Sequence, residues 1–271
     1  MKIAIIQMKN TEDKIYNLNH AKELVSEASD KGANIAILPE MFCCEYRNEA
    51  FIKNAEPAGE LIWQSLSEMA AQNSIYLVGG SMPEAEGDKI YNTSFVFDKS
   101  GKQIARHRKM HLFDIEVEGG QKFCESDTFS AGNEVTVFDT EFGKMGLIIC
   151  FDIRFPELSR LTALEGANII FCPAAFNMTT GPAHWELLFR SRACENQLFF
   201  CGCAPARNID GRYVSYANSI VTDPWGAIAA LAGASEEIML CDIDLNMLRS
   251  IRRQLPLMSA RRDDVYCLKT I

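Results

Sequence analysis

Three polar residues, Glu40, Lys109 and Cys150, each follow a run of residues that is typical of a buried strand. Strand ends are where α/β folds usually carry their sites. A thiol is a weak nucleophile while it is protonated, with a pKa of about 8.5, and it needs a base or a cation beside it. Glu40 could take the thiol proton and return it to a leaving amine, and Lys109 could stabilise a negatively charged tetrahedral intermediate. The three residues together predict acyl transfer through a cysteine.

Cys150 lies between an expected strand and an expected helix. Residues 146–149 are apolar and uncharged, which is typical of a buried strand, and leucines recur at helical spacing in residues 158–164. A thiol on such a turn is held by rigid structure and can still face a pocket. We expect the free backbone amides of Phe151 and Asp152 beside it, where an oxyanion could form.

Each of the three residues also has a purely structural interpretation. Cys150 is one of ten cysteines, and free cysteines are commonly buried and inert. Glu40 could lie near a helix terminus, and Lys109 could be a solvated member of the basic run at residues 106–109. Two histidines flank Lys109, but the glutamate of the H-E-x-x-H zinc motif is missing, so we expect no metal site.

The composition predicts one soluble domain over residues 1–271. With 48% hydrophobic residues the chain can bury a large core, and a net charge of −9 argues against a nucleic-acid surface. The sequence has no long uninterrupted apolar stretch, so we expect no membrane span. The short apolar N-terminus lacks a small-residue cleavage site and indicates a first strand, not a signal peptide. Ten scattered cysteines without C-x-x-C spacing indicate free thiols in a reducing cytosol, and hence a cytoplasmic protein.

Strands and helices are expected to alternate through the first eighty residues. Apolar periodicity predicts three strands, at residues 2–8, 34–40 and 75–80. It also predicts two helices, at residues 12–31 and 59–73. This alternation is the pattern of a sheet with helices packed on it.

A hairpin and a long loop follow. Residues 90–97 and 103–109 predict the hairpin, whose second arm leads to Lys109. Residues 110–134 are polar, contain glycines and include Glu125. A loop of this length in a compact domain is usually functional or disordered.

The second half of the chain repeats features of the first. The sequence GANIAILPE at residues 32–40 is echoed by GANIIFCPA at residues 166–174. We therefore predict two similar α/β halves, related by a pseudo-twofold, with their sheets face to face. Further strands are expected at residues 198–203, 215–222, 228–231 and 238–243, and a short helix at residues 245–251. The tail from about residue 252 is left unassigned and could form a packing or oligomer arm.

Three motifs in this order resemble the Glu–Lys–Cys signature of the nitrilase superfamily of carbon–nitrogen hydrolases. They are the Pro39-Glu40 pair, RKMHLF at residues 108–113 and CFDIRFPE at residues 150–157, and the similarity runs over about residues 2 to 257. The resemblance implies an α/β fold built as a four-layer α-β-β-α sandwich. It also implies a homodimer or larger homo-oligomer that associates through helices.

The resemblance also implies a role for each residue of the signature. Glu40 would be the general base and acid, Lys109 the cation that stabilises the oxyanion, and Cys150 the nucleophile that forms an acyl intermediate. Glu125 matches a second glutamate that many members carry near the site, where it would orient Lys109 or the substrate. The alternative for Glu125 is a solvated loop carboxylate.

The pattern is most similar to the omega-amidase branch of the superfamily, especially in FNMTTGPAHWELL at residues 176–188. That branch hydrolyses the side-chain amide of 2-oxoglutaramate and 2-oxosuccinamate to the dicarboxylate and ammonia. The resemblance implies a small-molecule amide as substrate, a thioester intermediate and no cofactor. Four alternatives stay open: a deaminated-glutathione amidase, an N-carbamoyl amine hydrolase, a nitrilase acting on nitriles, and an inactive binding protein of the same fold.

A substrate with a carboxylate needs a cation, and a guanidinium suits it because it can bind two oxygens at once. Arg154, four residues after Cys150, is the candidate, and the alternative is a salt bridge from Arg154 to Glu157 or Asp152. Further candidates for substrate contact are Tyr46, Phe151, Phe176, Thr179 and Thr180. The two threonines could instead belong to a turn that leads into a helix with a threonine cap.

Overall fold

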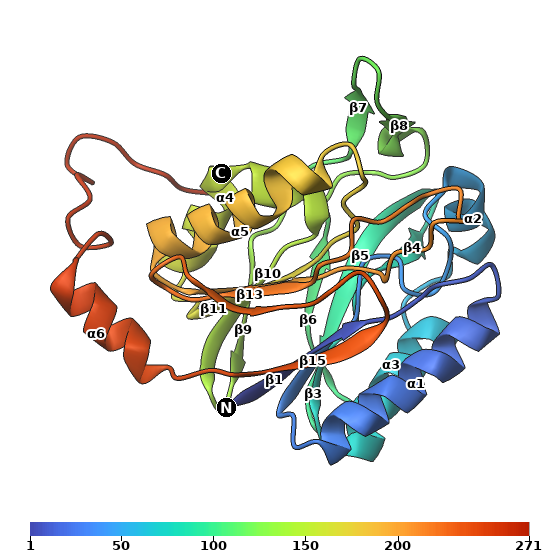
Figure 1. Ribbon diagram of the computed structural model, residues 1–271, viewed down its shortest axis with the longest axis horizontal. Coiled ribbons are helices and arrows are strands. Elements are labelled where there is room, and N and C mark those ends of the chain that lie inside the picture. Colours follow the sequence, from blue (N-terminus) through green and yellow to red (C-terminus); the bar gives the residue numbers. More distant parts are fainter. Residues whose placement is uncertain (271) are drawn as a thin grey trace.

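Two β-sheets lie face to face between two layers of helices in the computed structural model, which describes residues 1–270 (Figure 1). The first sheet has the order β15-β1-β2-β3-β5-β4, with β6 paired to β5. Its strands are β1 (Lys2–Gln7), β2 (Ile35–Ile37), β3 (Tyr76–Val78), β4 (Met82–Glu86), β5 (Lys89–Phe97), β6 (Gln103–Arg108) and β15 (Glu237–Asp242).

The second sheet has the order β14-β13-β12-β11-β10-β9. Its strands are β9 (Thr136–Thr140), β10 (Gly143–Leu147), β11 (Ile169–Pro173), β12 (Phe199–Cys203), β13 (Ile220–Thr222) and β14 (Ile228–Leu231). The helices are α1 (Lys14–Asp30), α2 (Asn48–Asn54), α3 (Leu61–Asn73), α4 (Pro156–Leu164), α5 (Gly181–Asn196) and α6 (Asn246–Gln254). Helices α1 and α3 cover the first sheet and α4 and α5 cover the second (Figure 1).

Side chains that alternate along β1 explain why the sheets stack. Ile3 and Ile5 belong to the core between the sheets, whereas Ala4 and Ile6 belong to the core beneath α1 and α3. Both faces of such a strand are removed from water, so its residues are apolar without the polar alternation of a half-exposed strand. The unbroken apolar runs in the sequence therefore correspond to strands in the middle of a four-layer sandwich.

The predicted repeat has a structural counterpart in the two sheets. Strands β1, β2 and β3 run parallel to one another, and so do β10, β11 and β12. The asparagine of each Gly-Ala-Asn motif makes the same contact. The backbone amide of Asn34 donates to Lys2 O at 2.8 Å, and the backbone amide of Asn168 donates to Lys144 O at 2.9 Å. The motif thus fixes where the second parallel strand of each half begins.

Several predicted boundaries were wrong. The strand predicted at 215–222 shrinks to β13, because Ala217 and Asn218 adopt the left-handed φ values of 58° and 57° that interrupt an extended chain. The loop predicted at 110–134 contains a small hairpin, β7 (Asp114–Glu116) and β8 (Lys122–Cys124). The predictions also missed β4, β9 and α2. Strand β15 crosses back to pair with β1 in the first sheet.

Three further expectations concern the last helix, the cysteines and membrane-spanning helices. The helix predicted at 245–251 is α6, which extends to Gln254 and buries Leu248 and Ile251. All ten cysteines lie within the described residues and are free thiols. None of the helices in residues 1–270 is long and apolar enough to cross a bilayer.

Two glycines in the second sheet allow its helices to approach closely. A methyl group at Gly202 would lie 2.4 Å from Phe189 Cζ on α5, and one at Gly146 would lie 2.2 Å from Thr162 Cγ2 on α4. Aromatic and branched side chains of the helices therefore occupy the space above these strands. Neither glycine has a positive φ, so space and not backbone conformation is the constraint.

We expect Gly202→Ala to lower the free energy of unfolding by about 1–3 kcal/mol, because the new methyl group overpacks against the Phe189 ring. The measurement is urea denaturation followed by circular dichroism. Gly233→Ala is the matched control, since its methyl group would meet nothing closer than 3.6 Å. Equal unfolding midpoints for the two variants would show that the second sheet and α5 are not packed as described.

Candidate active site

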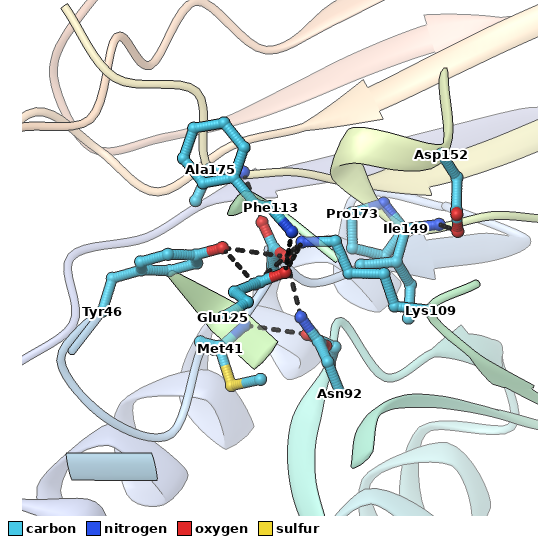
Figure 2. A network of polar contacts seen from close by, with 12 residues as sticks. Met41, Tyr46, Asn92, Lys109, Phe113, Glu125, Ile149, Asp152, Pro173 and Ala175 are labelled. Carbon is cyan, nitrogen blue, oxygen red and sulfur yellow. Dashed lines mark hydrogen bonds and ion pairs between the residues drawn. The ribbon is translucent and has the colours of Figure 1, made fainter. Parts of the chain in front are cut away.

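Lys109 is buried between two carboxylates. Its Nζ lies 2.9 Å from Glu40 Oε1 and 2.8 Å from Glu125 Oε2 (Figure 2). All three side chains are 0% exposed. The structural interpretations of Glu125 as a solvated loop carboxylate and of Lys109 as a solvated basic residue are therefore wrong.

The residues of this cluster come from the ends of different elements. Glu40 follows β2 and Lys109 follows β6 in the first sheet, whereas Cys150 follows β10 in the second. Glu125 follows β8 of the small hairpin. The backbone amide of Ala175, just after β11, donates to Glu40 Oε2 at 2.8 Å and links the two sheets at this point. Stacking the sheets therefore brings the strand ends together.

Neutral donors complete the coordination of the two carboxylates. Asn92 Nδ2 donates to Glu40 Oε1 at 2.8 Å, and the Tyr46 hydroxyl donates to Glu125 Oε1 at 2.7 Å. The backbone amide of Phe113 donates to Glu125 Oε2 at 2.7 Å. These bonds fix the orientation of both carboxylates, and Figure 2 shows them converging around Lys109 Nζ.

Burial and mutual charge shift the pKa values within the cluster. Burial raises the pKa of the Glu40 carboxyl, while Lys109 acts in the opposite direction and Glu125 adds to the rise. Burial alone would lower the pKa of Lys109, but Glu125 and Glu40 outweigh it and the pKa is raised well above its ordinary value. Lys109 is therefore a permanent cation, and Glu40 accepts a proton more readily than an exposed glutamate does.

Cys150 opens a 3₁₀ turn, Cys150–Arg154, and adopts a φ of 45°. Such a left-handed conformation is strained for a residue with a side chain, and it is found mainly where surrounding structure enforces it. The neighbouring Cys150 thiol acts to lower the pKa of the Glu40 carboxyl, against the larger effect of burial. Burial and then the Glu40 charge raise the pKa of Cys150 well above its ordinary value. At rest Cys150 is thus a protonated thiol beside a carboxylate that can accept its proton.

Only one of the two amides expected to be free beside Cys150 is free. The Asp152 amide donates to Ile149 O at 3.0 Å, because the chain continues into a 3₁₀ turn. Within residues 1–270 the Phe151 backbone amide donates no such hydrogen bond to a backbone carbonyl. Phe151 N is therefore the available backbone donor, and the expectation for Asp152 was wrong.

The Asp152 side chain joins the two strand ends that carry Lys109 and Cys150. Its Oδ2 accepts from Ile149 N and His107 Nε2, both at 3.0 Å. Its Oδ1 accepts from His111 N at 3.0 Å and His111 Nδ1 at 2.8 Å. The pKa of Asp152 is lowered well below its ordinary range, since these histidines outweigh the effect of burial. An ionised carboxylate thus holds the turn at Cys150–Arg154 (the nucleophile turn) against the end of β6.

A narrow recess lies beside the Cys150 thiol. Its lining consists of Phe113, Cys150, Phe151, Arg154, Ala175, Phe176 and Thr180. The structure therefore brings four of the candidate substrate-contact residues to the recess: Phe151, Arg154, Phe176 and Thr180. Tyr46, which donates its hydroxyl to Glu125, is not part of the lining, and neither is Thr179.

Arg154 has no acidic partner in the described chain, so the predicted alternative of a salt bridge to Glu157 or Asp152 is wrong. Its Nη1 contacts His184 Nδ1 at 3.1 Å, and its guanidinium lies 4.8 Å from the centre of the Phe176 ring. The buried Nε has no hydrogen-bond partner within residues 1–270. Burial lowers the pKa of Arg154, as expected for a cation without a counter-ion.

The turn before α5 is capped by asparagine and not by threonine. Asn177 Oδ1 accepts from the backbone amides of Thr179 at 3.0 Å and Thr180 at 2.9 Å. The Thr180 hydroxyl also donates to Asn177 Oδ1, at 3.1 Å. The threonine cap considered as an alternative is therefore wrong, and Thr180 lines the recess.

The sequence interpretation missed several residues of the site. Asn92, Phe113 and Ala175 contact the carboxylates, and Tyr213 donates its hydroxyl to Ala175 O. Two of these contacts are made by backbone amides, which leave no signal in residue type. Asn92 carries only a weak signal, because Thr93 and Ser94 follow it and make the middle of this hairpin arm polar.

A family model, related proteins and solved structures all match this chain over nearly its full length. A family model described as carbon–nitrogen hydrolase matches residues 2–253. Omega-amidase NIT2 of Mus musculus is 45% identical over 269 residues, which cover 99% of this chain and 98% of the mouse protein. A hydrolase of Schizosaccharomyces pombe is 46% identical over 267 residues, covering 98% of this chain and 83% of that protein. The crystal structure of Saccharomyces cerevisiae Nit3, a nitrilase superfamily member, has a TM-score of 0.89 and 41% identity, covering 97% and 96% of the two chains. The predicted fold is thereby confirmed.

We expect Asp152→Asn to lower the free energy of unfolding by about 3 kcal/mol, because the amide nitrogen would face hydrogen-bond donors and the buried charge would be lost. Urea denaturation measures this change. Asp139→Asn, the same substitution at an exposed position on β9, is the control. A variant at position 152 that unfolds with the wild-type midpoint would contradict the bridging role.

Proposed function

This chain belongs to the carbon–nitrogen hydrolase family, and from that premise we propose that it hydrolyses the side-chain amide of a small carboxylic acid. Candidate substrates are 2-oxoglutaramate and 2-oxosuccinamate, with ammonia as a product. One observation carries the proposal: an unpaired guanidinium, Arg154, shares a recess with a thiol whose neighbours are Glu40 and Lys109.

In the first half of the proposed reaction, Cys150 Sγ attacks the amide carbon. Glu40 takes the thiol proton as the carbon–sulfur bond forms, and its raised pKa favours this transfer. The negative charge that develops on the amide oxygen is stabilised by Lys109 and the Phe151 amide. Glu40 then returns the proton to the amide nitrogen, the carbon–nitrogen bond breaks and ammonia leaves. A thioester on Cys150 is the result.

In the second half, water attacks the thioester carbon. Glu40 takes one proton from the water, and the same donors stabilise the second oxyanion. The carbon–sulfur bond breaks, the carboxylic acid is released, and the proton on Glu40 returns to the Cys150 sulfur. Glu125 contacts Lys109 and is not itself one of the residues that line the recess, so we assign it the role of holding the lysine in place.

The proposed carboxylate contacts are Arg154 and Thr180. Both line the recess, and the apolar rings of Phe113, Phe151 and Phe176 exclude water around them. A guanidinium in such a setting binds a carboxylate more strongly than one exposed to solvent, because competing water is removed. An assembly of two or more copies and a cytoplasmic location stay predictions.

Ammonia release from 2-oxoglutaramate by the purified protein tests the proposal. We expect release by the wild type and none by Cys150→Ala, since no other thiol is among the described residues that line the recess. Cys194→Ala, which changes an exposed cysteine on α5, is the control and should retain wild-type activity. An inactive wild type whose Cys150 is still alkylated rapidly by iodoacetamide would retain the nucleophile and reject this substrate class.

We expect Glu40→Gln to lower kcat by about 10²–10⁴-fold, the usual contribution of a general base. In the wild type kcat/KM should fall as pH falls through the pKa of Glu40, because only the ionised carboxylate can take the thiol proton. Since that pKa is raised, the midpoint of this acidic limb should lie above 4.5. Glu165→Gln, an exposed position after α4, is the control. A limb at or below 4.5 would contradict the role of Glu40.

A further inference from the structure

Helix α5 contacts the nucleophile turn at two places. Arg192 Nε donates to Ile153 O at 2.8 Å and its Nη2 donates to Arg154 O at 3.1 Å, which fixes the backbone of the turn. Eight residues earlier, a spacing that returns to the same side of a helix, His184 contacts the Arg154 side chain. The helix therefore positions both the main chain and the guanidinium of Arg154.

The direction of the contact between Arg154 and His184 follows from chemistry. A guanidinium has five N–H donors, no acceptor, and does not lose its proton in proteins. His184 Nδ1, 3.1 Å from Arg154 Nη1, must therefore be the acceptor. The imidazole is consequently neutral, with its proton on Nε2.

Two kinds of contact together fix the orientation of the guanidinium. The rings of Phe176 and Phe151, with centres 4.8 and 5.5 Å from Arg154 Cζ, restrict the plane of the group. They leave it free to turn within that plane, because a ring face has no directional acceptor. The bond to His184 stops this turning and leaves the edge formed by Nε and Nη2 unoccupied. Nε on that edge is buried and has no partner in residues 1–270.

We propose that His184 is a positioning residue that determines specificity for acid-bearing amides. By holding Nη1, it presents the Nε–Nη2 edge of Arg154 for bidentate binding of a substrate carboxylate. The proposal rests on the proposed function, since it concerns the carboxylate of the same substrate. His184 itself does not line the recess and does not touch the reacting atoms.

The test measures binding of succinate, a four-carbon dicarboxylate, through its protection of Cys150 against alkylation by iodoacetamide. His184→Ala should raise the half-protecting succinate concentration about tenfold, as expected for a lost hydrogen bond to a charged group. His184→Asn should stay within about threefold of the wild type, since the asparagine oxygen can replace Nδ1 as acceptor. Glu186→Ala, at an exposed position on the same helix, should bind succinate as the wild type does.

The alkylation rate without succinate separates positioning from a general structural role. Iodoacetamide has no carboxylate, so this rate should be the same in all four proteins. A rate that falls in His184→Ala would mean that the whole turn is disturbed, and it would overturn the proposal. So would an unchanged half-protecting concentration, or a wild type that succinate does not protect.

Failure of the proposed function gives a different result. If the wild type releases no ammonia from 2-oxoglutaramate, but succinate protects it and His184→Ala weakens that protection, the substrate is rejected and the role of His184 stands. Rescue by His184→Asn is the outcome that an unspecific packing role would not produce.

Discussion

The buried ammonium of Lys109 is the constraint on which the rest of the site depends. Two carboxylates and one ammonium, all without solvent exposure, leave one negative charge uncompensated. Removing one partner from such a buried group costs about 3–5 kcal/mol, because the remaining charge is left unpaired. Donors from Asn92, Tyr46 and two backbone amides distribute that charge. The burial that makes this arrangement costly is also what raises the pKa of Glu40, as the proposed role of a base requires.

The same arrangement requires both halves of the fold. Glu40 and Lys109 follow strands of the first sheet, while Cys150 and Ala175 follow strands of the second. Each half alone supplies strand ends but not a site. The sandwich brings them into hydrogen-bonding distance, and Asp152 fixes the distance between them by accepting donors from both sides. The repeat in the sequence is therefore a means of placing two sets of strand ends against each other.

Glu40 and Cys150 carry a local signal, because each is a polar residue directly after an apolar run, whereas Lys109 follows basic residues at the end of the predicted hairpin arm. The structure brings Lys109 against Glu40, and the catalytic roles of the three residues stay predictions. The sequence was sufficient for the two halves, since the Gly-Ala-Asn motif recurs with the same backbone contact. It was not sufficient for the Phe113 and Ala175 amides, whose role depends on where the chain returns and not on residue type. The Asp152 amide was assigned wrongly because a 3₁₀ turn and an open turn have the same sequence signal. Strand β15 was placed correctly along the chain, but its partner was not predictable from local periodicity.

Electrostatics also explains why the site contains two separate cations. The proposed substrate brings a carboxylate into a recess beside a cluster that already has excess negative charge. Lys109 cannot compensate it as well, because its ammonium contacts Glu40 and Glu125 and its remaining donor is assigned to the oxyanion. A second cation is therefore needed beside the recess, and it must have no acidic partner of its own. Arg154 meets both conditions: its only polar side-chain contact in residues 1–270 is the neutral His184, and an anionic partner there would cancel the charge that the substrate needs.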